Sequence, residues 1–107
     1  NIKIIHTPGH FPDSLCYVME NIIFTGDTLF VGRTGRTIST NASTKELYYS
    51  IYDKILSLPG NTLIYPGHDY GKKPTISLKE NIKISPLLQA KSEKDFIERM
   101  ANYEANR

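Results

Sequence analysis

The sequence contains a single cysteine, Cys16, so it can form neither an internal disulfide nor a metal site built from several thiolates. No stretch approaches the roughly 18 consecutive apolar residues that a membrane span needs, and no segment resembles a signal peptide. An excess of one charge sign is also missing, because 13 Lys and Arg stand against 11 Asp and Glu. A broad polyanion-binding surface is therefore not indicated. We expect a soluble, cytoplasmic protein that binds neither nucleic acid nor membrane.

What is present is globular composition, with 39% hydrophobic and 22% charged residues in 107 positions. The length allows at most one ordinary domain, and neither a repeat nor a linker divides it. Apolar runs bounded by turn residues predict four strands, and Glu20-Asn21 predicts a tight hairpin between the second and third. The expected elements follow the order β, β, β, α, β, α, α, a mixed α/β fold, with strands at 2–5, 15–19, 22–25 and 62–65.

Three helices are expected, each after a serine that can cap it. Ser43 with Glu46 three residues on is a capping-box pattern, and the apolar spacing that follows is helical until Pro59-Gly60. The second helix follows Ser77 and is stopped by Pro86, and the third follows Ser92. The residues predicted to face the core in the first helix are Leu47, Ile51, Ile55 and Leu58.

The residues able to carry chemistry follow apolar strands. His6, His10 and His68 all lie in such loops, and so does Asp27. Loops after strand ends commonly hold catalytic groups on α/β scaffolds. Imidazole nitrogen and carboxylate oxygen are ligands that Zn, Fe(II) and Mn accept.

Each of these residues also has a plainer interpretation. A single His after a strand is most often a hydrogen-bonding loop residue, and Gly-Asp at a strand end is usually a turn. Cys16 lies in an alternating strand, where a buried and inert thiol is expected. Arg33 and Arg36 are as well explained by a solvated loop. Taken singly, none of these residues predicts a function.

Taken together, three motifs resemble the C-terminal half of a metallo-β-lactamase-fold hydrolase. They are HTPGH at 6–10, FTGDTLF at 24–30 and YPGHDY at 65–70. Their order and spacing are similar to those of the branch that holds hydroxyacylglutathione hydrolase (glyoxalase II) and the persulfide dioxygenases. The resemblance extends over nearly all of the chain and implies the C-terminal half of an αββα sandwich.

The resemblance implies a site for two divalent metal ions, zinc in the first place and iron or manganese as alternatives. His10 would be a ligand of the first metal, His68 of the second, and Asp27 would bridge the two. His6 resembles the family's strand-end residue, whose role is structural. Arg36 stands where glyoxalase II has a glutathione-binding Lys, and Tyr70 matches a glutathione-contacting Tyr.

Two observations limit what the resemblance implies. Ile38 replaces a second glutathione-contacting Tyr, so the thiol of the substrate stays open. The family's His-x-His-x-Asp-His motif, which supplies four metal ligands, is absent from the 107 residues. We therefore expect residues 1–107 to be the C-terminal part of one domain, whose N-terminal half is the partner. One face of the sheet should be apolar, should be covered by that half in the complete protein, and should favour self-association of the 107 residues alone. The candidate residues of this face are Ile2, Ile4, Leu15, Tyr17 and Ile23.

The expected function of the complete protein is a metal-dependent hydrolase that cleaves a thioester or related small ester through a metal-bound hydroxide. Asp27, His10 and His68 would act through the metals, and Arg36 would bind a substrate carboxylate. A mononuclear iron persulfide dioxygenase is the alternative enzyme and needs only His10 and Asp27 from these residues. A non-enzymatic half-domain that serves as a binding module is the third possibility. The 107 residues alone are expected to be inactive.

Overall fold

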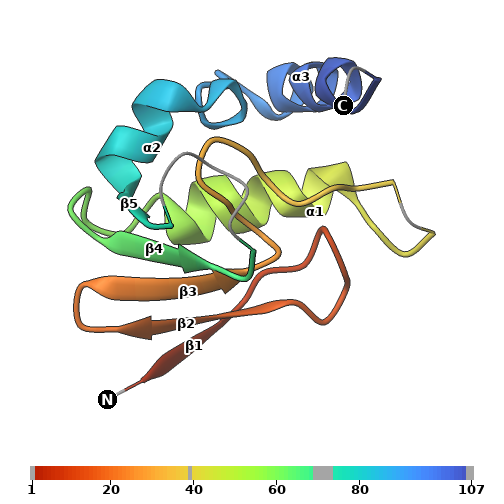
Figure 1. Ribbon diagram of the computed structural model, residues 1–107. Helices are drawn as coiled ribbons and strands as arrows, with labels where there is room; N and C mark the ends of the chain where they lie inside the picture. Colours follow the sequence, from red (N-terminus) through yellow and green to blue (C-terminus); the bar gives the residue numbers. More distant parts are fainter. Residues whose placement is uncertain (1, 39, 69–73, 106–107) are drawn as a thin grey trace.

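The computed structural model describes residues 2–38, 40–68 and 74–105 and confirms a mixed α/β fold (Figure 1). Five strands form one sheet in the order β1-β2-β3-β4-β5, with β3 and β4 parallel and the other neighbours antiparallel. The elements are β1 (Lys3–His6), β2 (Leu15–Met19), β3 (Ile22–Gly26), α1 (Thr44–Tyr49), η1 (Ser50–Ile55), β4 (Leu63–Pro66), β5 (Ile76–Ser77), α2 (Leu78–Ile84), η2 (Pro86–Leu88) and α3 (Glu93–Ala105).

The predicted caps of the three helices are confirmed. Ser43 and Ser77 each accept a hydrogen bond from the backbone N–H three residues on, and Ser92 does the same for Asp95 N–H. The first helix begins as predicted and changes to π geometry at η1, where Leu56 N–H donates to Ile51 O at 2.8 Å. Its helical residues end at Ile55, before the predicted stop at Pro59-Gly60. None of the helices in the described ranges is long and apolar enough to cross a membrane.

The helices lie on one side of the sheet (Figure 1), and the core fills the space between. Leu47, Ile51 and Ile55 are fully buried, as the helical spacing predicted. They meet Cys16, Ile23 and Ile64 from the sheet and Phe96 and Met100 from α3. Leu58 packs only partly buried against this core.

The other side of the sheet carries apolar side chains that remain exposed. The strand register places Ile4, Tyr17, Phe24 and Tyr65 side by side across β1 to β4, and the rings of Phe24 and Tyr65 meet edge to face at 5.6 Å. Ile2, Ile4, Leu15 and Tyr17, predicted for this face, are 64%, 60%, 42% and 42% exposed.

The prediction that Ile23 belongs to the same face is wrong. Ile23 is opposite Val18 in the register and is fully buried in the core, whereas Phe24 takes the exposed position opposite Tyr17. Ile22, Ile23 and Phe24 are apolar in succession, so alternation alone does not fix which of them faces out.

Two short elements were not predicted. β5 has two residues and pairs with β4, and η2 is a single 3-10 turn that opens at Pro86. Both are too short to leave a periodic pattern. Pro86 does end α2 as predicted, because proline cannot continue the hydrogen bonding of the preceding turns.

Candidate functional site

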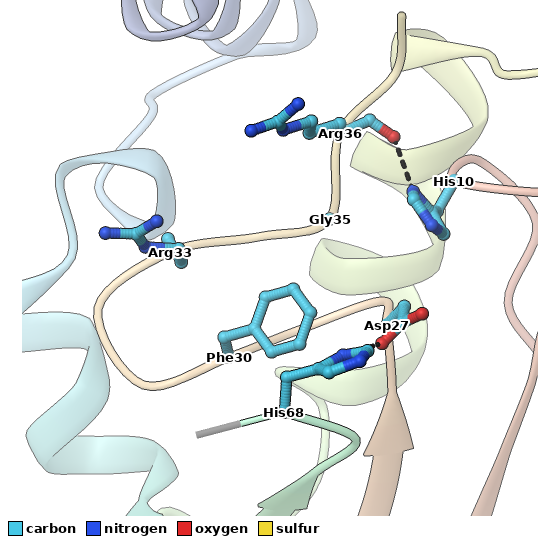
Figure 2. A pocket seen from close by; sticks show the side chains of 7 residues that line it. All are labelled: His10, Asp27, Phe30, Arg33, Gly35, Arg36 and His68. Atoms are coloured by element: carbon cyan, nitrogen blue, oxygen red, sulfur yellow. Dashed lines mark hydrogen bonds and ion pairs between the residues drawn. The ribbon is translucent and has the colours of Figure 1, made fainter. Parts of the chain in front are cut away.

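Three loops that follow strands meet at one cleft of about 420 Å³. His10 comes from the loop after β1, Asp27 from the end of β3 and His68 from the end of β4. The structure thus brings together the three side chains that the sequence predicted as metal ligands. Figure 2 shows them along one side of the cleft, with the two arginines across from them. The lining residues are His10, Asp27, Phe30, Arg33, Gly35, Arg36 and His68.

The His10 loop is held against the helix layer by hydrogen bonds to the backbone carbonyls of Pro8 and Gly9. Ser50 Oγ donates to Pro8 O at 2.7 Å, and Ser43 N–H donates to Gly9 O at 2.7 Å. His10 Nδ1 in turn donates to the backbone carbonyl of Arg36 at 2.7 Å, because a carbonyl oxygen only accepts. In the neutral ring Nε2 then keeps the lone pair, which is how proteins prepare an imidazole for a metal.

Asp27 and His68 contact each other directly, with His68 Nδ1 2.8 Å from Asp27 Oδ1. Both remain accessible, since their side chains are 41% and 54% exposed. Gly67 N–H donates to Gly26 O at 2.7 Å and joins the two loops beneath this pair. Phe30 lies beside the His68 ring at a centroid separation of 6.2 Å. The Asp27–His68 pair therefore lies at the surface of the cleft, and a backbone hydrogen bond connects the two loops that carry it.

The segment after Asp27 folds back on itself and lines the cleft. Leu29 and Thr34 form an isolated antiparallel bridge, and Gly35 N–H donates to Thr28 O at 3.0 Å. A Cβ at Gly35 would lie 2.0 Å from the backbone oxygen of Asp27. Only glycine allows this approach, so Gly35 fixes the distance between the Asp27 and Arg36 parts of the loop.

Replacing Gly35 by alanine is expected to push Asp27 out of place and to destabilise the domain by about 2–4 kcal/mol. Metal affinity should fall with it, because the Asp27 carboxylate no longer faces His68. Gly60→Ala is the matched control, since its Cβ would meet only Lys79 Cβ at 3.4 Å. Thermal unfolding and metal content of both variants test this, and a Gly35→Ala protein as stable as Gly60→Ala would contradict it.

Arg36, predicted to bind a substrate carboxylate, lines the cleft, with its backbone carbonyl turned to His10 and its guanidinium extending the other way (Figure 2). Tyr70, the other predicted substrate-binding residue, lies outside the described residues. Phe30, Arg33 and Gly35 also line the cleft and were not predicted. The short spacing of Arg33 and Arg36 in the GRTGR run was the one sequence feature that could have indicated Arg33. Only the folded loop shows that both arginines line the same cleft.

Two residues that the sequence set aside are accounted for by other contacts. His6 Nε2 donates to Pro12 O at 2.7 Å, which holds the turn of its own loop. Cys16 is fully buried, 3.4 Å from Thr7 Oγ1. Burial raises the pKa of its thiol, while hydrogen bonds from Thr7 and Thr28 act against the shift. The thiol therefore stays protonated and inert, as predicted.

The donor set suits a divalent metal, but it is incomplete. Neutral imidazole and carboxylate match Zn, Fe(II) and Mn, and the His10 tautomer already directs Nε2 as a ligand. Within residues 2–38, 40–68 and 74–105, however, no group of three or more His, Cys, Asp or Glu side chains is placed to hold a metal ion. A catalytic zinc normally has three protein ligands, so a zinc ion at this cleft would need further ligands.

Comparison of the chain with known proteins supports the same fold. The chain is 39% identical over 98 residues to the mitochondrial persulfide dioxygenase ETHE1 of Mus musculus. The aligned region covers 90% of the chain and 38% of the mouse protein. A probable hydroxyacylglutathione hydrolase of Schizosaccharomyces pombe is 43% identical over 75 residues, 66% of the chain and 28% of that protein. The crystal structure of ETHE1 from Myxococcus xanthus superposes on this chain with a TM-score of 0.87 at 38% sequence identity. The superposed region covers 95% of this chain and 45% of the Myxococcus chain.

The chain thus spans less than half the length of these relatives, and their names include both a hydrolase and a dioxygenase. The family model of the metallo-beta-lactamase superfamily matches residues 1–68, which include the loops of all three candidate ligands. The chain belongs to the metallo-β-lactamase superfamily.

Proposed function

We propose that these residues form one half of the active site of a metal-dependent enzyme that cleaves a thioester or related small ester. The observation that carries the proposal is the meeting of His10, Asp27 and His68 at a single cleft, with Asp27 directly beside His68. Three loops far apart in sequence supply these groups, and each loop is fixed by backbone hydrogen bonds. That preorganisation is what a metal site requires of its ligands.

Each residue of the cleft has a separate role in the proposed reaction. His10 Nε2, the Asp27 carboxylate and His68 would hold divalent metal, whose chemistry is to polarise a carbonyl and to lower the pKa of water. The Arg36 carbonyl keeps the proton of His10 on Nδ1. Phe30, 4% exposed, provides an apolar wall beside His68. The Arg36 guanidinium binds a carboxylate of the substrate across from the reacting end.

Persulfide oxygenation is the second candidate, because the ETHE1 proteins of Mus musculus and Myxococcus xanthus are 39% and 38% identical to the chain. A mononuclear iron site would take only His10 and Asp27 from this chain. His68 would then orient the Asp27 carboxylate through the 2.8 Å hydrogen bond rather than bind metal.

The role of His68 separates the two candidates. In the hydrolase, His68→Ala should reduce the metal content from two ions towards one and lower thioester turnover by about a hundredfold or more. In the dioxygenase, the same variant should keep its single iron. The control is His6→Ala, which removes an imidazole that is bonded to its own loop. Metal analysis and assays with a thioester and a persulfide decide between them, and a complete protein that binds no metal contradicts both.

The covering of the open sheet face is part of the same proposal. We propose that the N-terminal half of the domain packs on the row formed by Ile4, Tyr17, Phe24 and Tyr65. The relatives are more than twice as long as the part they share with this chain, so they have chain enough to cover it. The same half would supply the ligands that the described residues lack.

Arg36→Ala should impair substrate binding more than the chemical step. If the guanidinium binds a carboxylate, its loss raises KM by about ten- to a hundredfold, the value of one charged hydrogen bond, with a much smaller change in kcat. Steady-state kinetics on an acidic thioester and on its neutral ester analogue give the measurement. An unchanged KM for the acidic substrate would leave Arg36 as a surface charge.

A further inference from the structure

The peptide group between Arg36 and Thr37 is hydrogen-bonded at both of its ends. Its oxygen, Arg36 O, accepts from His10 Nδ1 at 2.7 Å (Figure 2). Its nitrogen belongs to Thr37, whose N–H donates to Glu104 Oε1 of α3 at 2.9 Å. A peptide group is planar and trans, so its C=O and N–H point in opposite directions. The three groups therefore form one chain of hydrogen bonds, in which the Glu104 carboxylate is connected to His10 through the peptide.

The side chain of Thr37 supports the same attachment. Thr37 Oγ1 donates a longer hydrogen bond of 3.3 Å to Glu104 Oε1, and it lies 2.6 Å from the Oγ1 of Thr44, the first residue of α1. A hydroxyl has one proton, and that of Thr37 goes to Glu104, so Thr44 donates the second bond. Thr37 is thus held between the start of α1 and the end of α3.

Glu104 occupies a position that helix stability alone does not favour. It is the last residue but one of α3 as the structure describes it, and no basic residue lies in the last described turn of that helix. The C-terminal end of a helix carries partial negative charge, so a carboxylate there is mildly unfavourable. What Glu104 stabilises is Thr37, through two hydrogen bonds, and with it the loop that lines the cleft.

A carboxylate on the N–H side of a peptide affects the C=O side. Hydrogen bonds to an ionised acceptor are stronger than neutral ones, and successive bonds in a chain polarise one another. The charge of Glu104 therefore makes Arg36 O a better acceptor, which strengthens the bond from His10 Nδ1 and keeps the lone pair on Nε2. A carboxylate or carbonyl bonded to the second ring nitrogen raises the basicity of a metal-binding histidine. Here a carboxylate acts through a carbonyl.

We infer that Glu104 is a positioning residue of the site: through the Arg36–Thr37 peptide it fixes the ring of His10 and raises the affinity of Nε2 for a divalent metal. This rests on the proposed function, in which His10 is a metal ligand. It makes α3 part of the metal site, although the residues that line the cleft belong to the loops after β1, β3 and β4.

The test uses the complete protein, with NMR of its imidazole N–H protons before metal is added and zinc titration afterwards. Glu104→Ala removes the acceptor, and Glu104→Gln keeps an acceptor oxygen without the charge. Glu98→Ala, which removes an exposed acid from the same helix, is the matched control. The internal reference is His6 Nε2–H, which is bonded to Pro12 O and lies outside the chain of hydrogen bonds from Glu104 to His10.

Glu104→Ala should raise the Kd for zinc about tenfold and move the His10 Nδ1–H resonance upfield, because a proton in a weaker hydrogen bond is more shielded. Glu104→Gln should lie between Glu104→Ala and the wild type, while Glu98→Ala matches the wild type. An unchanged His10 resonance or an unchanged zinc Kd in Glu104→Ala overturns the inference. So does an equal shift at His6, which would show a general loss of structure. Failure of the proposed function looks different: the wild type binds no zinc, although its His10 proton still responds to substitution of Glu104.

Discussion

Asp27→Ala is expected to lower the turnover of the complete enzyme by about a thousandfold or more, with little loss of folded structure. Asp27 Oδ1 lies 2.8 Å from His68 Nδ1, and both candidate functions need Asp27 as a ligand. Losing the metal removes several kcal/mol of transition-state stabilisation, which corresponds to a rate loss of this size.

The fold should survive because Asp27 stabilises it little. Its side chain is 41% exposed and its partner His68 is 54% exposed, and ion pairs this accessible contribute at most about 1 kcal/mol. Asp13→Ala, in the exposed loop after β1, is the matched control. Activity, metal content and circular dichroism are measured together. Full turnover with full metal occupancy in Asp27→Ala would refute the assignment of this residue.

The positions of the candidate ligands after strand ends could be predicted because they are local features of the sequence, whereas their roles as metal ligands come from the family resemblance and stay predictions. His10, Asp27 and His68 each follow an apolar strand, and a strand end fixes where the next side chain emerges. The helix starts could be predicted for the same reason, because the side chains of Ser43 and Ser77 each accept a hydrogen bond from a backbone N–H only three residues away.

What could not be predicted depends on contacts between distant segments. Arg33 reaches the cleft because the loop after β3 folds back and because Asn81, about 50 residues later, bonds to it. The burial of Ile23 depends on the register with Val18 across the hairpin. Neither contact leaves a periodic pattern, so composition and spacing say nothing about them.

The 107 residues alone are expected to bind zinc only weakly and to have no hydrolase activity. His10, Asp27 and His68, divided between two metal positions, give each position at most two ligands, even when Asp27 is counted for both. A catalytic zinc normally has three protein ligands in addition to water. Zinc titration should therefore show affinity weaker than micromolar, and thioester turnover should be absent.

The same chain is expected to self-associate through the open face of its sheet. Ile4 and Tyr17 are 60% and 42% exposed, and a contiguous apolar face of this kind favours association. Tyr17→Lys should shift the chain towards monomer in sedimentation experiments. Ile84→Lys is the matched control, because Ile84 is 55% exposed on α2, on the helix side of the sheet, and should leave association unchanged.

Adding the N-terminal half of the domain should reverse both defects at once. It would cover the row of Ile4, Tyr17 and Phe24 and supply the missing ligands, so association should fall while zinc affinity and turnover rise. Tyr17→Lys should weaken this complementation, because a buried lysine has no partner on an apolar face. Micromolar or tighter zinc binding, or turnover, by a monodisperse monomer of the 107 residues alone would show that the site does not need a second half.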